Sequence, residues 1–237
     1  MRNFTIAAVL VVTALNPLPA HPQDRQQAIA ALERGDYVSA FRGLLPLAEA
    51  GDADAQYMVA TMHRGVPGVP KNNAEAARWF EKAAENGHDE AQFDLASMYL
   101  NGLGVPRDLT KSVIWFRRAA DKGNARAQYN LAAMYRKGTG VPVDLAEAAR
   151  WFRSAADQGI PEAQFTIANL YARGEGVAQD LVQAYVWLTL AVEHAPPSSE
   201  ARPAAMRDLE VVARMLSADE ILRAKRMARQ WRPKRPH

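Results

Sequence analysis

Cysteine is absent from the 237 residues of the chain. The chain therefore has no disulfide, no thiolate metal site and no cysteine nucleophile. It also lacks the cysteine to which the lipid of an acylated lipoprotein is attached. The chain also lacks a large excess of charge of one sign, since 29 Lys and Arg stand against 26 Asp and Glu. Nucleic-acid binders concentrate positive charge along a whole face, so we expect no nucleic-acid partner.

Long apolar runs are also missing, apart from one short run near the N-terminus. It extends from Phe4 to Leu15, follows the basic Arg2, and ends at Pro17 and Pro19. Twelve helical residues cover about 18 Å, whereas the core of a bilayer is about 30 Å thick. A basic start, a short apolar stretch and a small residue, Ala20, are typical of a secretion signal. We predict cleavage after Ala20 and a protein that is periplasmic or secreted; the alternative is an N-terminal helix of the fold.

The usual signatures of catalysis are absent too. The sequence has no His-Glu-x-x-His, no Gly-x-Ser-x-Gly and no phosphate-binding Gly-x-x-x-x-Gly-Lys-Ser/Thr. Asp52 and Asp54 resemble the start of a calcium loop but lack its glycine turn, and we interpret them as acids in the first turn of a helix. The sequence predicts no enzyme, no cofactor and no metal site. The histidines are widely separated: His21, His63, His88, His194 and His237.

What the chain does contain is a repeat of 36 residues. Each copy carries a glycine, an Ala-Gln-aromatic triplet, a Gly-Val loop and a tryptophan at the same positions. Four copies in register are too many to arise by chance. The first-position glycines are Gly51, Gly87, Gly123 and Gly159, and the tryptophans are Trp79, Trp115, Trp151 and Trp187.

Each copy predicts two helices. In the third copy, Ala127, Leu131, Met134 and Tyr135 fall at i, i+4, i+7 and i+8, which is one apolar stripe at helical period. The segment 137–142 contains two glycines and a proline, so it ends this helix.

Asp144 then caps the second helix of the copy, and Glu147 is expected to complete a capping box. Ser217 and Glu220 predict another box in the C-terminal region. The buried side of the second helix is predicted to carry Ala148, Trp151, Phe152, Ala155 and Ala156.

A helix pair cannot bury such stripes alone, but stacked pairs can. The predicted fold is therefore all-α, a solenoid of stacked antiparallel helix pairs. Two further helices, about 204–216 and 218–231, follow the last copy. We divide the chain into a signal peptide (1–20), an N-terminal capping helix pair (24–50), four repeats (51–86, 87–122, 123–158 and 159–194) and C-terminal capping helices with a basic tail (195–237).

The unit at 123–158 closely resembles the Sel-1-like repeat, a relative of the tetratricopeptide repeat, and the resemblance covers 51–194. It implies a right-handed superhelix that works as an adaptor or scaffold. The resemblance also implies that secreted bacterial relatives have roles in envelope signalling, exopolysaccharide export, motility and host interaction. One branch, with a disulfide in each repeat, is linked to β-lactam binding, and this chain departs from it because it has no cysteine.

The first copy departs from the repeat pattern. Val66 stands where the later copies have glycine, and His63 stands where they have tyrosine. We predict a rearranged loop in this copy and a packed or half-exposed ring for His63.

The resemblance implies that the first helix of each pair lines a concave face that contacts a protein partner of unknown identity. Residues on this face differ between copies, which indicates either partner contact or unconstrained surface. The candidate contact residues are Met58, Thr61, Asp94, Ser97, Asn130, Thr166 and Asn169.

The C-terminal stretch concentrates positive charge and contains no acid from Ile221 onward. It predicts either contact with an acidic polysaccharide, anionic lipid or acidic protein, or a solvated last helix followed by a frayed tail. The residues are Arg223, Lys225, Arg226, Arg229, Arg232, Lys234 and Arg235.

We interpret the chain as an adaptor that binds another protein. Two alternatives stay open: a cell-wall or β-lactam-processing hydrolase, which needs a pocket with a convergent nucleophile and base, and a binder of acidic polysaccharide or lipid through the tail. The sequence does not indicate an oligomeric state.

Overall fold

The structure, a computed structural model, describes residues 22–199 and 201–234, so the predicted signal peptide lies outside the described residues. Within this part the chain forms twelve helices joined by short loops. They are α1 (Pro22–Glu33), α2 (Tyr37–Glu49), α3 (Ala53–His63), α4 (Asn73–Glu85), α5 (Asp89–Asn101), α6 (Leu109–Asp121), α7 (Ala125–Lys137), α8 (Leu145–Asp157), α9 (Pro161–Arg173), α10 (Leu181–His194), α11 (Ala201–Arg214) and α12 (Ala218–Gln230).

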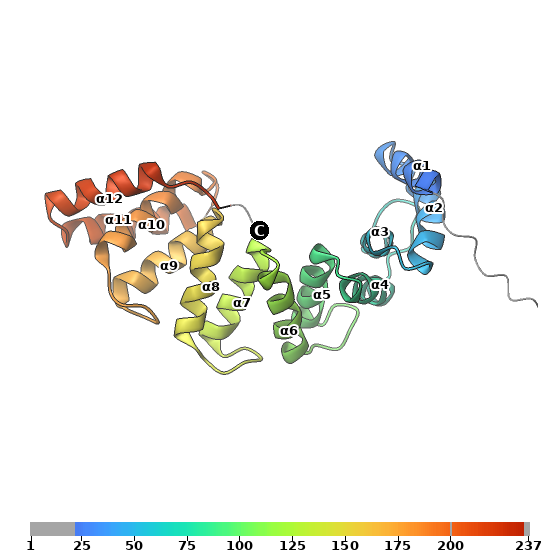
Figure 1. Cartoon of the computed structure of the whole chain (residues 1–237), viewed down its shortest axis with the longest axis horizontal. Coiled ribbons are helices and arrows are strands. Elements are labelled where there is room, and N and C mark those ends of the chain that lie inside the picture. Colours follow the sequence, from blue (N-terminus) through green and yellow to red (C-terminus); the bar gives the residue numbers. More distant parts are fainter. Residues whose placement is uncertain (1–21, 200, 235–237) are drawn as a thin grey trace, which may run out of the picture.

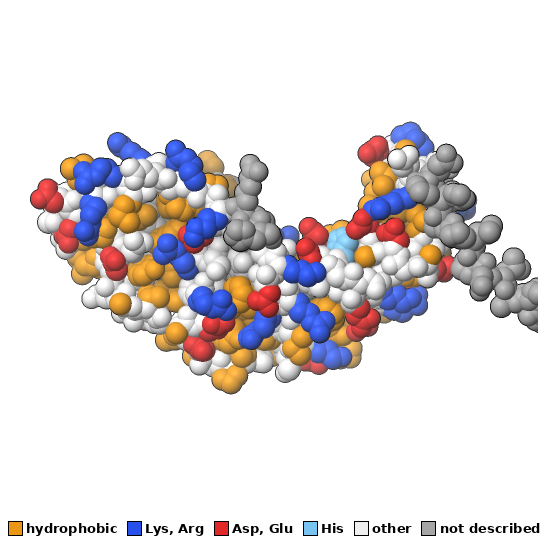
Figure 2. Space-filling model, in the orientation of Figure 1, with side chains coloured by type: hydrophobic (Ala, Val, Ile, Leu, Met, Phe, Trp, Pro, Cys, Tyr) orange, Lys and Arg blue, Asp and Glu red, His pale blue; other side chains and the backbone are white. Residues whose placement is uncertain are grey.

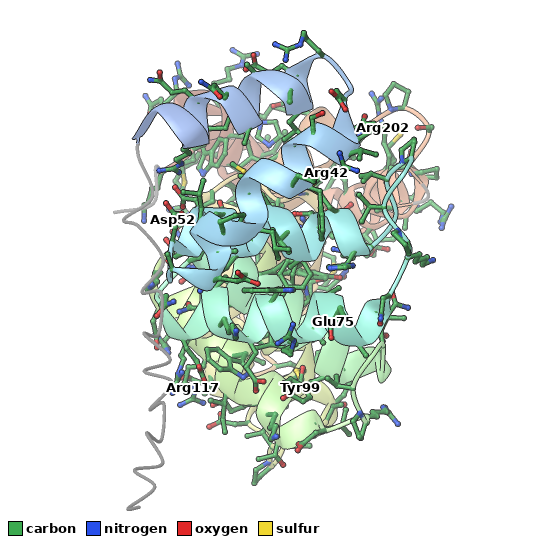
Figure 3. The ribbon with its side chains drawn as sticks, turned by 90° about the vertical axis from the view of Figure 1, so that its right-hand side faces the viewer. Arg42, Asp52, Glu75, Tyr99, Arg117 and Arg202 are labelled. Carbon is green, nitrogen blue, oxygen red and sulfur yellow. The ribbon has the colours of Figure 1, made fainter. Side chains whose placement is uncertain are left out.

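Consecutive helices pack against one another from α1 to α10, and the pairs follow one another along a crescent (Figure 1). Seen from the N-terminal end, the helices of the first repeats lie one above another as layers (Figure 3). Asp52, at the start of α3, and Glu75, at the start of α4, lie on opposite sides of this view, because the two helices are antiparallel. The predicted all-α solenoid of helix pairs is confirmed.

The core of the array is built from the predicted columns of apolar residues. Phe80, Phe116 and Phe152 are at most 1% exposed, and the paired alanines of the second helices are buried beside them. Small residues at these points let neighbouring helices approach closely, while the aromatic rings fill the space between layers. The core is therefore continuous from one repeat to the next.

Helix caps follow the sequence prediction at most positions. Asp144 accepts a hydrogen bond from the backbone N–H of Glu147, and the predicted capping box of Ser217 and Glu220 is present with both bonds. The box predicted at Glu147 is wrong. Its carboxylate binds Arg150 through two nitrogens and accepts from the indole N–H of Trp151, and these charge-assisted bonds outcompete the backbone N–H of the cap.

The first repeat has the rearranged loop that the sequence predicts. In the later repeats the first helix ends on a left-handed glycine, such as Gly138 at φ +70°. Helix α3 instead ends at Arg64 in right-handed conformation, and Val66 forms an isolated β-bridge with Val69. His63 packs edge-on against Phe41 at 5.2 Å between ring centroids.

The C-terminal helix α11 begins three residues before its predicted start. Pro203 lies in its first turn, where the missing N–H of proline is not needed for a helical hydrogen bond. Helix α12 matches its prediction to within one residue.

The buried glutamines of the repeat form a ladder that links each repeat to the one before it. Each side-chain amide donates to a backbone carbonyl at the end of the preceding second helix, as Gln128 does to Ala120. In three of the four repeats, the carbonyl oxygen of the amide then accepts from a residue at the C-terminal end of the next second helix. These pairs are Gln56 with Asn86, Gln128 with Gln158, and Gln164 with His194.

The second repeat breaks the ladder. Its corresponding residue is Lys122, whose ammonium turns away to the Gly87 carbonyl and the Asp89 carboxylate. Gln92 Oε1 therefore has no hydrogen-bond partner in the described part of the chain, although Gln92 is only 4% exposed. An unsatisfied buried acceptor costs about 1–3 kcal/mol.

Replacing Lys122 by glutamine is expected to stabilise the protein. The new amide supplies the donor that Gln158 supplies in the next repeat, which is worth about 1 kcal/mol, while the exposed pair with Asp89 is worth less. The measurement is the free energy of unfolding in urea, with Lys122→Ala as the control that loses the ion pair without gaining a donor. A Lys122→Gln protein no more stable than the alanine control would contradict the account.

Candidate partner-binding surface

The predicted contact residues lie on the first helices α3, α5, α7 and α9, and all of them are partly exposed. They form two columns that run across the repeats, with the second column three residues after the first. The first column is Met58, Asp94, Asn130 and Thr166, and the second includes Thr61, Ser97 and Asn169.

Most polar side chains of these columns are bonded to their own helix. Ser97 Oγ donates to the Phe93 carbonyl, Asn130 Nδ2 to the Arg126 carbonyl, and Thr166 Oγ1 to the Glu162 carbonyl, each four residues back. Thr61 and Asn169 make the same kind of bond. These bonds hold the side chains close to the helix surface and leave oxygen lone pairs directed outward. Apart from Met58, the residues named in the columns therefore present short, ordered polar side chains.

Asp94 differs from the other column residues because it links two repeats. Its carboxylate lies 3.1 Å from the guanidinium of Arg64 on the preceding repeat, and its side chain is only 17% exposed. Burial raises the pKa of this carboxyl, while the cations of Arg64 and Arg126 act in the opposite direction. Asp94 thus has a structural role in addition to its place in the column.

An aromatic stack lies beside Asp94 that the sequence analysis missed. The rings of Tyr57 and His88 are parallel, with centroids 4.2 Å apart. His88 also caps α5, since its Nδ1 accepts from the backbone N–H of Ala91. The two rings join the first helices of repeats one and two, and burial raises the pKa of the Tyr57 hydroxyl.

The basic residues of α12 are exposed, and Lys and Arg side chains gather along the edge of the molecule over the C-terminal helices (Figure 2). Leu222, Lys225, Arg226 and Arg229 fall at i, i+3, i+4 and i+7, so they share one outward face. The exposed basic residues of α12 are four of the predicted tail residues: Arg223, Lys225, Arg226 and Arg229.

The segment after α12 is not frayed as far as Lys234, because its residues pack against α8 and α10. Trp231 packs against His194 and Trp187, and Lys234 binds Asp157 through both its backbone N–H and its ammonium, each at 2.8 Å. Arg232 donates to the Arg229 and Trp231 carbonyls. Arg235 lies outside the described residues.

The histidines and acids of the described residues form no metal-binding cluster, and the histidines make structural contacts. No group of three His, Asp or Glu residues in the described ranges could hold a metal ion. His63, His88 and His194 pack against a ring, cap a helix and extend the glutamine ladder, respectively. Among the twelve helices described, none combines the length and the apolar character that crossing a bilayer requires.

Comparison with known proteins agrees with this architecture. The model of the Sel1 repeat matches residues 53–88, 89–124, 125–160 and 161–195. It starts each repeat two residues later than the units defined from the sequence, on the same period. No curated protein matches the chain.

Two solved structures are similar to this chain. One is a protective antigen present in uropathogenic Escherichia coli strains and displaying an SLR fold, with 31% identity and a TM-score of 0.71 over 88% of this chain. The chain covers 44% of that protein, less than half of its length. The other is a Sel1 repeat protein from Oxalobacter formigenes, with 25% identity and a TM-score of 0.72, covering 88% of this chain and 85% of that one.

The match to the repeat model extends over more than half of the chain, and each matched range contains one helix pair. Sel1 repeat proteins generally mediate protein–protein interactions, and the family is generally non-enzymatic. This chain belongs to the Sel1 repeat family.

Proposed function

We propose that this protein is an exported adaptor that binds a protein partner along the first helices α3, α5, α7 and α9 and catalyses no reaction. The observation that carries the proposal is the pair of columns on these helices. The scaffold around them repeats closely, whereas the columns differ in side chain from repeat to repeat, and their polar side chains are ordered by bonds to their own helices. Family membership supports the partner class.

Binding on this surface needs little reorganisation. The columns stand on helices whose opposite faces are locked in the core, and their side chains are already bonded to the carbonyls four residues back. A partner therefore meets acceptors that are already fixed. Complex formation then costs less side-chain entropy of this protein than it would if the surface side chains were mobile. The protein acts by mass action, without a cofactor.

The test is capture of partners from an envelope extract, with a cytoplasmic extract beside it, by the full chain and by an Asn130→Glu, Thr166→Glu, Asn169→Glu variant. These three partly exposed positions lie on α7 and α9, whereas Asp94 is left unchanged because it holds two repeats together. A partner identified by mass spectrometry and then measured by calorimetry is expected to bind the variant at least about tenfold more weakly.

The matched control places three negative charges on second helices instead, as Thr110→Glu, Ile114→Glu and Ala146→Glu. These side chains are exposed, and two of them lie in first helical turns, where a carboxylate is favourable. The control is expected to bind as the parent does. A partner that both variants bind equally well would place the contact elsewhere, and a partner found only in the cytoplasmic extract would contradict export.

A further inference from the structure

The segment Trp231–Lys234 packs against the solenoid in the way that a bound peptide would, although it belongs to the same chain. After α12 the backbone returns to the end of α8 (Figure 1). The indole of Trp231 lies over the turn glycine Gly159, where an added Cβ would lie 3.6 Å from Trp231 Cη2. Its ring centroid lies 4.9 Å from that of His194. Three residues on, Lys234 binds the carbonyl and the carboxylate of Asp157.

The repeat places an equivalent slot one period earlier. Moving back 36 residues from Asp157, Gly159, Trp187 and His194 gives Asp121, Gly123, Trp151 and Gln158. These four residues line an open pocket of about 390 Å³, and the ion pair of Asp157 and Lys234 from the occupied slot forms part of the same lining. Gly123 has the same positive φ as Gly159, +91° against +90°, so the two turns have the same shape.

The turn before that one is closed by the chain itself. The ammonium of Lys122 binds the carbonyl of Gly87 and lies 3.7 Å from the point that a Cβ on this glycine would occupy. The repeats have four such turns, and a Cβ added to the glycine of the first, Gly51, would meet no atom within 4 Å. A cation thus covers the turn at Gly87, and an aromatic ring covers the turn at Gly159. The pocket lies at the turn between them, at Gly123.

The pocket differs from the slot of Trp231 in being more polar. Arg150 and Ser154 stand where the occupied slot has Val186 and Leu190. The Arg150 guanidinium already lies over the Trp151 ring, 4.1 Å from its centroid, and binds Glu147 with two nitrogens, so it is fixed in place. Its outer face can take a second aromatic ring, because a guanidinium stacks on either side. Asp121 is exposed at the end of α6, where Asp157 stands in the occupied slot.

We propose that the pocket at Gly123 binds an extended peptide segment of a partner protein in which an aromatic residue is followed, three positions later, by a lysine. The aromatic ring packs over Gly123 against Gln158 and Arg150, and the lysine ammonium pairs with the carboxylate of Asp121. This spacing is that of Trp231 and Lys234 in the neighbouring slot. The site lies at the turns between repeats and does not use the columns of the first helices, so it is additional to the proposed adaptor surface.

The experiment measures binding of a fluorescein-labelled peptide, Arg-Met-Ala-Arg-Gln-Trp-Arg-Pro-Lys, to the full chain by anisotropy. This peptide has the sequence of residues 226–234. We expect saturable binding with a Kd of about 10–100 µM, as for a small interface with one aromatic anchor. Asp121→Lys is expected to raise the Kd at least about tenfold, and so is replacing the peptide's tryptophan by alanine. Asp121→Lys places a cation at a helix C-terminus, which preserves folding, and circular dichroism checks it.

Glu85→Lys is the matched control, because it makes the same charge change at the equivalent position of the preceding turn, which Lys122 already covers. It is expected to change the Kd by less than about twofold. Equal weakening by Asp121→Lys and Glu85→Lys would overturn the proposal, since it would show unspecific charge attraction. Peptide binding unaffected by Asp121→Lys would overturn it too. The Asn130→Glu, Thr166→Glu, Asn169→Glu variant is expected to bind the peptide normally, so failure of the adaptor surface and failure of this site are distinguished.

Discussion

Replacing Phe116 by alanine is expected to lower the free energy of unfolding by about 3–5 kcal/mol. The ring is 0% exposed, lies on α6, and packs against the ring of Phe93 on α5 with centroids 5.7 Å apart. Its loss removes apolar burial and leaves a cavity between two layers that the backbone of neighbouring helices cannot easily fill. Urea unfolding followed by circular dichroism gives the change.

The chain provides its own control for this prediction. The equivalent residue of the fourth repeat is Leu188, which is 1% exposed. Leucine is therefore compatible with this position of the repeat, and Phe116→Leu is expected to cost about 1–1.5 kcal/mol. A loss as small for alanine as for leucine would mean that the layers close over the cavity.

The position in the array adds a second readout. Each repeat contacts only its neighbours, so stability is a sum of repeat terms and interface terms. Phe116 lies in the second of four repeats, and weakening it separates the N-terminal part from the C-terminal part. We therefore expect the unfolding transition of Phe116→Ala to broaden, in contrast to that of Phe116→Leu.

The periodic part of the fold could be predicted because the same pattern of apolar residues occurs in every repeat. The stripe of Ala127, Leu131, Met134 and Tyr135 has helical period, and the same stripe occurs at 36-residue intervals in the other copies. All four residues are buried in α7. Local rules at the helix ends were equally informative, as at Ser217, whose capping box depends only on residues within one turn.

Features that depend on residues far apart in the sequence were not predictable in the same way. The glutamine column was visible as a repeated residue, but the residues that bond to its oxygens differ: Asn86, Gln158 and His194. The break at Gln92 arises because Lys122, at the equivalent position, binds Gly87 and Asp89 instead. The contact of Lys234 with Asp157 joins residues 77 positions apart and occurs once, so no sequence repeat could predict it.

On the candidate surface, too, periodic features could be predicted and contacts between distant residues could not. Helical period placed Asn130 and Asn169 on first helices, where the structure has them. The pairing of Asp94 with Arg64 could not be predicted, because Arg64 lies 30 residues away, where the chain departs from the repeat pattern. The contact role of these columns remains a prediction, to be tested by the charge variants.

Replacing Gly140 by alanine is expected to lower the free energy of unfolding by about 3 kcal/mol. Gly140 has φ +73°, which costs an alanine about 1–2 kcal/mol. Its Cβ would also lie 2.5 Å from the carbonyl oxygen of Leu109, the first residue of α6 in the preceding repeat. Because this neighbour is backbone, relief requires the loop and the preceding helix to move apart, at about 1–3 kcal/mol.

The comparison that isolates this contact is Gly35→Ala. Gly35 has φ +75°, nearly the same as Gly140, but no atom lies within 4 Å of the position that its Cβ would take. Gly35→Ala therefore reports the backbone cost alone, and the excess loss in Gly140→Ala reports the contact between repeats. Equal losses in urea unfolding would contradict the account, because they would show that the loop does not press on the preceding repeat. The same contact occurs at Gly176 against Leu145, so an excess at Gly140 identifies the loop glycine as a spacer that sets how closely successive repeats stack.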